Sequence, residues 1–170
     1  SQYLSKSLKI IGCYGVFKTN YLKKIGGIRQ LGKGFSPYAD NLLAIQASSL
    51  NQVVIIKSPL LFYRTHLGSL SLISTDLNAY LTAQQDLVSK SLSIISQKQL
   101  ALLLQWCIKD FSAVIIRSGS IRRKEIFSYL LFLKKHLKSL KGTTFFWPTV
   151  KSILLNFVRI PVKIFFKKYF

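Results

Sequence analysis

The stretch Ser96–Gly119 reads SQKQLALLLQWCIKDFSAVIIRSG, and its pattern decides how the second half of the sequence is interpreted. Ser96 followed by Gln99 forms a capping box, in which each side chain bonds the backbone of the other residue at the start of a helix. Gly119 is the kind of residue at which helices end. Apolar residues recur in between at the spacing of one helix face, which predicts a buried side: Leu100, Leu103, Leu104, Cys107, Phe111, Val114 and Ile115.

The neighbouring sequence after residue 75 also predicts helices. Thr75 is placed to cap a helix that runs to about Ile95, and Ser120 is placed to cap another that stops at Gly142. Lys109 and Asp110 interrupt the longest apolar run. Since a bilayer-spanning helix needs about 20 largely apolar residues in succession, no spanning helix is expected.

The sequence before residue 75 mixes helix, turn and strand signals. A short helix is expected over Thr19–Ile25, with Thr19 as its N-cap and Gly26-Gly27 as its stop, and a second helix over Tyr38–Leu50. Apolar runs beside turn residues predict strands over Ser7–Val16, Val53–Lys57 and Leu60–Arg64. The predicted fold class is an α/β N-terminal portion followed by an all-α, basic, amphipathic C-terminal region.

Composition restricts the class of partner. The net charge is +20, from 25 Lys and Arg against 5 Asp and Glu. This balance favours a polyanionic partner, either nucleic acid or an anionic membrane surface.

Cys13 and Cys107 lie far apart and are expected to be reduced thiols rather than metal ligands or a disulfide. The start at Ser1 and the absence of Met suggest a fragment of a longer protein.

The scarce acidic residues are the first candidates for chemistry. Asp76, Asp86, Asp110 and Glu125 lie in helical sequence and are expected to be solvated positions or helix starts. Asp40 differs, because it follows a loop with two glycines and a proline and falls in the first turn of the next helix. A site can be built around a carboxylate at such a junction. From spacing alone, a first-turn acid that interacts with the helix dipole is the simpler interpretation.

His66 is the second candidate. It follows a predicted strand in Tyr63-Arg64-Thr65-His66, where a histidine beside an arginine can contact a diphosphate or a metal. By itself a lone histidine is more often structural. His136 lies next to Lys134 and Lys135 and is expected on a solvated helix face.

The order of these segments carries a resemblance. Gly26-Gly27, Ala39-Asp40-Asn41-Leu42-Leu43, Val53–Leu60, Tyr63-Arg64-Thr65-His66 and Ser69-Leu70-Ser71 occur in that sequence, within about Ile10–Ser71. Together they resemble the second half of the catalytic domain of family 2 glycosyltransferases. The resemblance is specific in the combination of elements, whereas each element alone is weak.

The resemblance implies a GT-A fold, a Rossmann-like α/β sandwich, and a function. The enzyme would transfer a sugar from a nucleotide-sugar donor to a hydroxyl of a saccharide or lipid-linked acceptor, with inversion. Asp40 matches the catalytic base. Arg64 and His66 match the segment at the donor diphosphate, where His66 would also complete a Mg²⁺ or Mn²⁺ shell. Tyr38 and Asn41 flank the base and are expected to line the acceptor pocket.

The sequence also departs from the family pattern. It has no Asp-x-Asp metal motif, and Ala39-Asp40 stands where many members have two acids. The N-terminal, nucleotide-binding half and the main metal ligands are therefore expected outside this sequence, and the 170-residue chain alone is not expected to bind donor productively. The predicted domains are 1–74, the C-terminal half of the catalytic domain, 75–142, a helical extension, and 143–170, a basic membrane-surface helix.

More than half of the basic residues follow residue 116, interleaved with bulky apolar ones. The last helix is expected over Val150–Phe170, kinked at Pro161, with an apolar side and a polar stripe of Ser152, Asn156, Arg159, Lys163 and Lys167. Such helices lie in the membrane interface, which would place the enzyme in the cytoplasm at the inner membrane, in cell-surface polysaccharide or glycolipid synthesis. The alternative for this region is simple packing on the catalytic domain. For the whole chain, two alternative functions remain. One is a nucleic-acid-binding module, for which no known motif is visible, and the other is a non-catalytic, membrane-associated scaffold.

Overall fold

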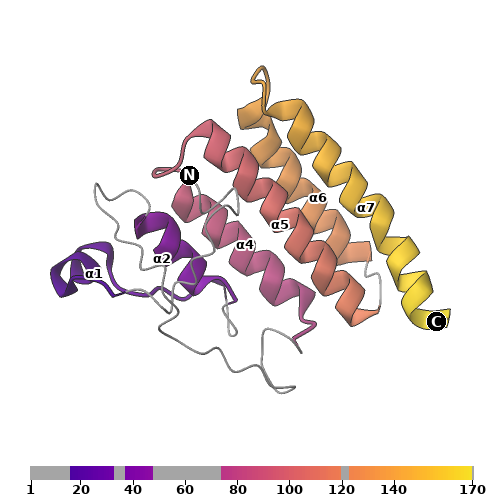
Figure 1. Ribbon diagram of the computed structural model, residues 1–170, viewed down its shortest axis with the longest axis horizontal. Helices are drawn as coiled ribbons and strands as arrows, with labels where there is room; N and C mark the ends of the chain where they lie inside the picture. Colours follow the sequence, from indigo (N-terminus) through magenta and orange to yellow (C-terminus); the bar gives the residue numbers. More distant parts are fainter. Residues whose placement is uncertain (1–15, 33–36, 48–73, 120–122, 170) are drawn as a thin grey trace, which may run out of the picture.

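The computed structural model describes residues 16–32, 37–47, 74–119 and 123–169, and within these ranges every regular element is a helix (Figure 1). Two helices precede residue 74 and the others follow it. The elements are α1 (Thr19–Ile25), α2 (Ala39–Ala47), α4 (Leu77–Ser91), α5 (Gln97–Ser118), α6 (Arg123–Leu137), the 3-10 turn η2 (Lys138–Leu140) and α7 (Phe146–Tyr169).

The predicted α/β fold class is wrong for the part of the chain that the structure describes. No strand occurs there, and Val16, the described end of one expected strand, has no regular structure. The rest of that strand and the strands expected at Val53–Lys57 and Leu60–Arg64 lie outside the described residues. The physical reason is visible at α2, whose apolar residues pack on helix α4 instead of on a sheet. Helix α2 therefore packs as part of the helical body, whereas no residue of α1 is buried.

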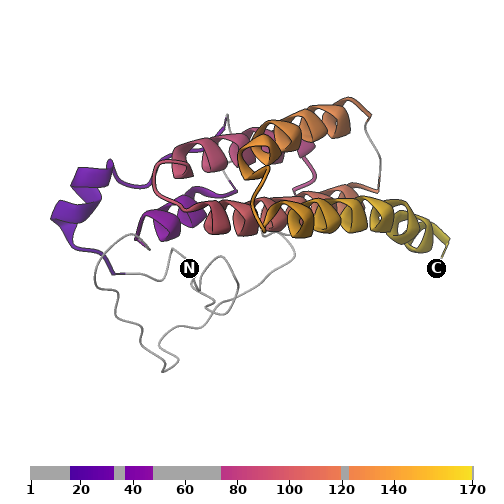
Figure 2. The same cartoon turned by 90° about the horizontal axis from the view of Figure 1, so that it is seen from above.

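Four long helices form this body in two layers. Figure 2 shows α5 and α7 side by side in one layer and α4 and α6 in the other. α5 packs most extensively on α7 and also contacts α4, while α6 contacts α4. Helices in such packing bury one apolar stripe each. The two central helices are therefore α4 and α5: α7 packs on α5, and α2 and α6 pack on α4.

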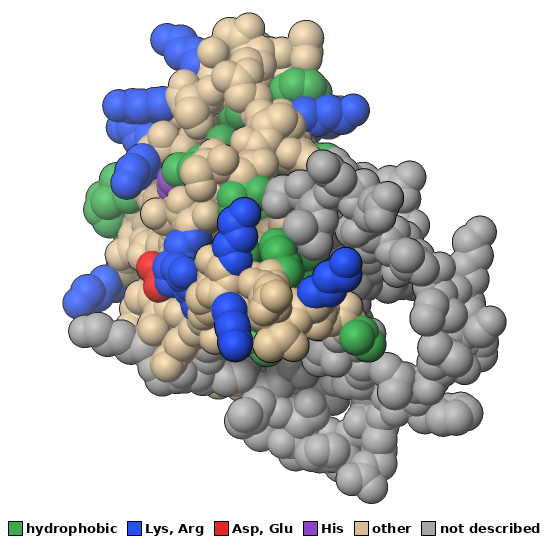
Figure 3. Space-filling view, turned by 90° about the vertical axis from the view of Figure 1, so that its left-hand side faces the viewer, with side chains coloured by type: hydrophobic (Ala, Val, Ile, Leu, Met, Phe, Trp, Pro, Cys, Tyr) green, Lys and Arg blue, Asp and Glu red, His purple; other side chains and the backbone are tan. Residues whose placement is uncertain are grey.

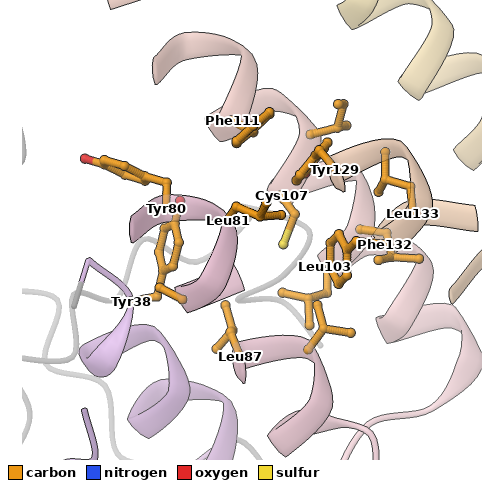
Figure 4. Close-up of a cluster of buried hydrophobic side chains, with 14 of the residues drawn as sticks. Tyr38, Tyr80, Leu81, Leu87, Leu103, Cys107, Phe111, Tyr129, Phe132 and Leu133 are labelled. Atoms are coloured by element: carbon orange, nitrogen blue, oxygen red, sulfur yellow. The ribbon is translucent and has the colours of Figure 1, made fainter. Parts of the chain in front are cut away.

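The side of α5 that its apolar spacing predicted to be buried is buried. All seven apolar positions of the expected α5 face are buried, and Ala101, Ile108 and Ser112 join them. Figure 4 shows Leu103, Cys107 and Phe111 facing side chains of α4 and α6. The Phe111 ring stacks on Tyr129 with 3.9 Å between centroids. One continuous core therefore joins α2, α4, α5, α6 and α7.

The ends of α5 confirm the local signals of its sequence. The Ser96 hydroxyl accepts from the Gln99 amide, and the Gln99 side chain accepts from the Ser96 amide at 2.8 Å, which completes the capping box. Gly119 ends the helix in the left-handed region at φ 66°. The expected stop of α1 is also confirmed, because Gly26 has φ 79° at its C-cap.

Other expected ends shift by a few residues. Asp76 caps α4 in place of Thr75, because its carboxylate accepts from the amides of Asn78 and Ala79 at 3.0 Å each. Lys18 holds the N-cap position of α1, so Thr19 is the first helical residue. Ser120, the expected cap of α6, lies outside the described residues.

The last helix is longer than expected. α7 begins at Phe146 rather than at Val150, and Pro161 lies inside it. A proline removes one backbone donor from a helix interior, and here the helix continues past it to Tyr169.

One helix of the described chain, α5, is long and apolar enough to cross a membrane by length and composition. More than half of its apolar window is buried inside the structure. A core helix passes the same test, and α5 is the core helix of this body.

Candidate functional site at the start of helix α2

Three of the predicted site residues gather at the start of α2: Tyr38, Asp40 and Asn41. Arg64 and His66 lie outside the described residues. The pairing of Asp40 with the Arg-x-His segment therefore stays a prediction. Asp40 and the residues that support it all lie in the described part of the chain.

Asp40 is the second residue of α2 and is partly exposed. Its Oδ1 accepts from the Asn41 amide at 2.9 Å. The unpaired amides and the dipole of a helix N-terminus favour a negative charge in the first turn. Asp40 is thus an ionisable carboxylate that is fixed at its backbone and reachable from solvent.

Tyr38 fixes the backbone just before Asp40. Its buried hydroxyl donates to the Asp110 carboxylate of α5 and accepts from Gln84 Nε2 of α4 at 2.8 Å. Gln84 Nε2 also donates to the Cys107 carbonyl at 3.1 Å. Burial, and then the negative charge of Asp110, raise the pKa of Tyr38 far above its usual range, so the hydroxyl stays a neutral donor.

Aromatic packing also holds the Tyr38 ring. Tyr80 and Trp106 contact it edge to face, with centroids at 5.8 and 5.2 Å. Figure 4 shows Tyr38 beside Tyr80 in this cluster. Edge-to-face aromatic pairs add directional stability beyond the buried area.

The inner side of α2 provides the other anchor. Leu42 and Ile45 belong to the main core, and Leu43 and Ala44 are also buried. Asp40 therefore lies between a tyrosine locked in the core and a helix turn packed on α4. A site residue held by rigid, packed elements keeps its geometry better than one on a free loop.

Two acids were misjudged from sequence. Asp110, expected to be solvated, is the partner of Tyr38, and Asp86 accepts from the Gly32 amide at 2.8 Å. Gly32 has φ 72°, and a Cβ on it would lie 3.1 Å from the Ala83 amide nitrogen of α4, so this close approach requires glycine. Sequence spacing gives no sign of such contacts, because the partners lie 72 and 54 positions away. The one available clue was a charge inside the apolar run of α5.

His136 was expected on a solvated face and is instead buried. Its ring meets Phe132 edge to face at 5.0 Å. Burial, and then the charge of Lys135, lower the pKa of His136. The imidazole is therefore a neutral core side chain rather than a surface cation.

No group of three or more His, Cys, Asp or Glu side chains placed to hold a metal ion occurs among the residues that the structure describes. The Mg²⁺ or Mn²⁺ expected from the resemblance has its predicted ligand, His66, outside those residues. Cys107 is a buried free thiol with a raised pKa, which suits a core residue and not a nucleophile.

Comparison with protein-family models, with curated proteins and with solved structures gave no match. The resemblance to family 2 glycosyltransferases thus rests on the residues quoted from the sequence.

Proposed function

We propose that this chain supplies the general base of a glycosyltransferase, and that Asp40 is that base. One observation carries the proposal beyond the sequence pattern. Asp40 is a partly exposed carboxylate whose flanking residues, Tyr38 and Leu42, are both locked in the core. A general base must be held in place and reachable by the proton that it removes.

The proposed reaction is a direct displacement at the anomeric carbon of a nucleotide-sugar. The acceptor hydroxyl oxygen forms the new bond to the anomeric carbon while its proton passes to the Asp40 carboxylate. The bond from the anomeric carbon to the diphosphate oxygen breaks, and the nucleoside diphosphate leaves with the electron pair. Attack opposite the leaving group inverts the configuration.

The other roles follow the predicted assignment, with one change. Tyr38 has its hydroxyl committed to Asp110 and Gln84 and acts as a positioning residue. Asn41, partly exposed beside the base, is the acceptor-side residue. Arg64 and His66 are proposed at the diphosphate, where Mg²⁺ or Mn²⁺ would neutralise charge on the leaving group. The main metal and nucleotide contacts would come from outside this sequence, since it has no Asp-x-Asp motif.

The test uses the chain in its native cells, with whatever partner segments it has there. Membranes from cells that lack the gene, and from cells complemented with it, are given labelled nucleotide-sugars and Mn²⁺, and transfer to lipid and polysaccharide is counted. Complementation is expected to restore transfer, and Asp40→Asn is expected to lower its rate by about 10²–10⁴-fold, the usual contribution of a general base.

Asp76→Asn is the matched control. It removes the same charge at the start of another helix, and asparagine caps helices as well as aspartate does. This variant should keep the wild-type rate. The proposal fails if complementation restores no transfer, or if Asp40→Asn transfers sugar as fast as Asp76→Asn.

A further inference from the structure

Helix α7 turns some of its polar residues toward the body and some of its apolar residues away from it. Toward the body it presents Thr149, which is buried and accepts from Gln105 Nε2 of α5 at 3.2 Å, together with Ile153 and Ile160. Ser152 and Asn156 of the expected polar stripe are partly buried, and Asn156 Nδ2 donates to the Ser152 carbonyl at 2.7 Å. Polar side chains of α7 therefore form hydrogen bonds within the fold.

The side of α7 that faces away from the body is apolar. The exposed fractions of its side chains are 73% for Trp147, 60% for Leu154, 46% for Leu155 and 67% for Val158. These residues recur at helical intervals and form one stripe. We call them the outer face of α7. A helix of a soluble protein normally turns such residues inward, and a continuous apolar patch marks an interaction site.

Basic side chains lie within and beside the outer face. Lys151 falls within the stripe, Arg159 lies next to Val158, and both are exposed. The segment before α7, made of α6, η2 and the following turn, is basic as well. Its exposed basic residues are Arg123, Lys124, Lys134, Lys135, Lys138 and Lys141, and Glu125 is the acid in this part of the described chain. Figure 3 shows Lys and Arg side chains spread over the described part of another side of the molecule, with little acid among them.

Charge decides between the possible occupants of this face. A second copy of the chain would bring a net charge of +20 against a net charge of +20, and like charges across an interface are unfavourable. An anionic membrane offers both an apolar layer for Trp147, Leu154 and Val158 and negative headgroups for Lys151 and Arg159. Tryptophan and long basic side chains are the types that settle at this boundary.

We propose that the outer face of α7 docks on an anionic membrane surface, with α7 lying in the plane of the interface. The apolar stripe enters the boundary between headgroups and acyl chains, and the lysine and arginine bind the lipid phosphates. The proposal does not depend on the role of Asp40.

The fluorescence of Trp147 can report whether the outer face of α7 contacts lipid. The chain has two tryptophans, and Trp106 is partly buried against Tyr38. In the Trp106→Phe variant, emission comes from Trp147 alone. We expect the solvent-exposed spectrum of this variant to shift to the blue with phosphatidylglycerol vesicles and to be quenched by lipids brominated on their acyl chains. Pure phosphatidylcholine vesicles should change it little.

Vesicle flotation with paired variants separates this face from general basicity. Leu154→Ser/Val158→Ser and Lys151→Glu/Arg159→Glu should each lower partitioning at least tenfold, because each basic residue near an anionic surface contributes about fivefold and each apolar side chain about tenfold or more. The matched controls are Ile28→Ser/Leu92→Ser, exposed apolar residues elsewhere, and Lys90→Glu/Lys98→Glu, the same change of charge elsewhere. The controls should keep most of the binding.

Three outcomes would overturn the proposal. The first is Trp147 emission that is already blue without lipid, which means that protein covers the face. The second is a dimer in sedimentation that Leu154→Ser/Val158→Ser dissociates. The third is equal loss of flotation in the face variants and their controls. The side chains replaced in the flotation variants are all exposed, so these variants are expected to fold. Circular dichroism checks this for them and for Trp106→Phe.

Discussion

At the scale of single residues, polar side chains far apart in the sequence meet inside the fold. Tyr38, which precedes α2, joins Gln84 of α4 and Asp110 of α5 in one hydrogen-bonded network. The sequence identified Tyr38 and Asp110 separately, as an acceptor-lining residue and a solvated acid, because spacing along one helix says nothing about a partner on another. Asp40, by contrast, could be predicted in the first turn of its helix from the loop residues before it.

Tyr38→Phe tests the network. The change leaves the Asp110 carboxylate without this donor and takes one partner from the Gln84 amide. A buried polar group that loses its partner costs about 1–3 kcal/mol, so the free energy of unfolding in urea should fall by that amount. Tyr21→Phe, a change on α1 where no residue is buried, should have no effect. An equal, small effect of both changes would contradict the network.

Replacing Tyr129 by phenylalanine is expected to raise stability, the opposite of the effect of Tyr38→Phe. Its ring is buried against Phe111, yet its hydroxyl has no hydrogen-bond partner in the part of the chain that the structure describes. Tyr129→Phe removes that unpaired group and keeps the ring, so the free energy of unfolding should rise by about 1 kcal/mol. A loss of stability in urea unfolding would show that the hydroxyl is bonded.

At the scale of elements, the helices that the sequence predicted best are those with local end signals. The capping box and Gly119 set α5 correctly, and its apolar spacing identified the face that is buried. The strands expected at Val53–Lys57 and Leu60–Arg64 lie outside the described residues, and α2, predicted as a helix, packs on α4 rather than on a sheet. For α7, the sequence predicted one apolar side, but among the side chains described there the structure buries Ile153 and Ile160 and leaves Leu154 and Val158 exposed.

Ser96→Ala tests the local signal of α5. It removes the hydroxyl that accepts from the Gln99 amide, and loss of an N-cap costs about 1 kcal/mol. Ser96→Asp, which keeps an N-cap acceptor, should retain stability. If thermal or urea unfolding of Ser96→Ala matches the wild type, the cap contributes nothing to the fold.

At the scale of the whole molecule, burial of weak acids predicts sensitivity to alkali. Burial is the largest cause that raises the pKa of Tyr38, Tyr129 and Cys107 above their ordinary values of 10.0, 10.0 and 9.0. Above about pH 9 the unfolded chain releases protons that the folded chain keeps. The unfolded state then binds fewer protons, so stability falls as pH rises.

Urea unfolding between pH 7 and 11 measures this effect. The free energy of unfolding should be steady up to about pH 9 and then decline, each fully buried group adding up to about 1.4 kcal/mol per pH unit. Tyr129→Phe should make the decline less steep. Stability that is constant to pH 11 would mean that these side chains are reached by solvent.

The whole body of helices gives Asp40 its fixed place, and the proposed function depends on the proton that this carboxylate removes. The most direct measurement is the ratio of sugar-transfer rates between membranes that carry Asp40→Asn and membranes that carry Asp76→Asn, at equal amounts of protein. We predict a ratio of about 10⁻² or lower. A ratio near one would show that Asp40 is an ordinary first-turn acid.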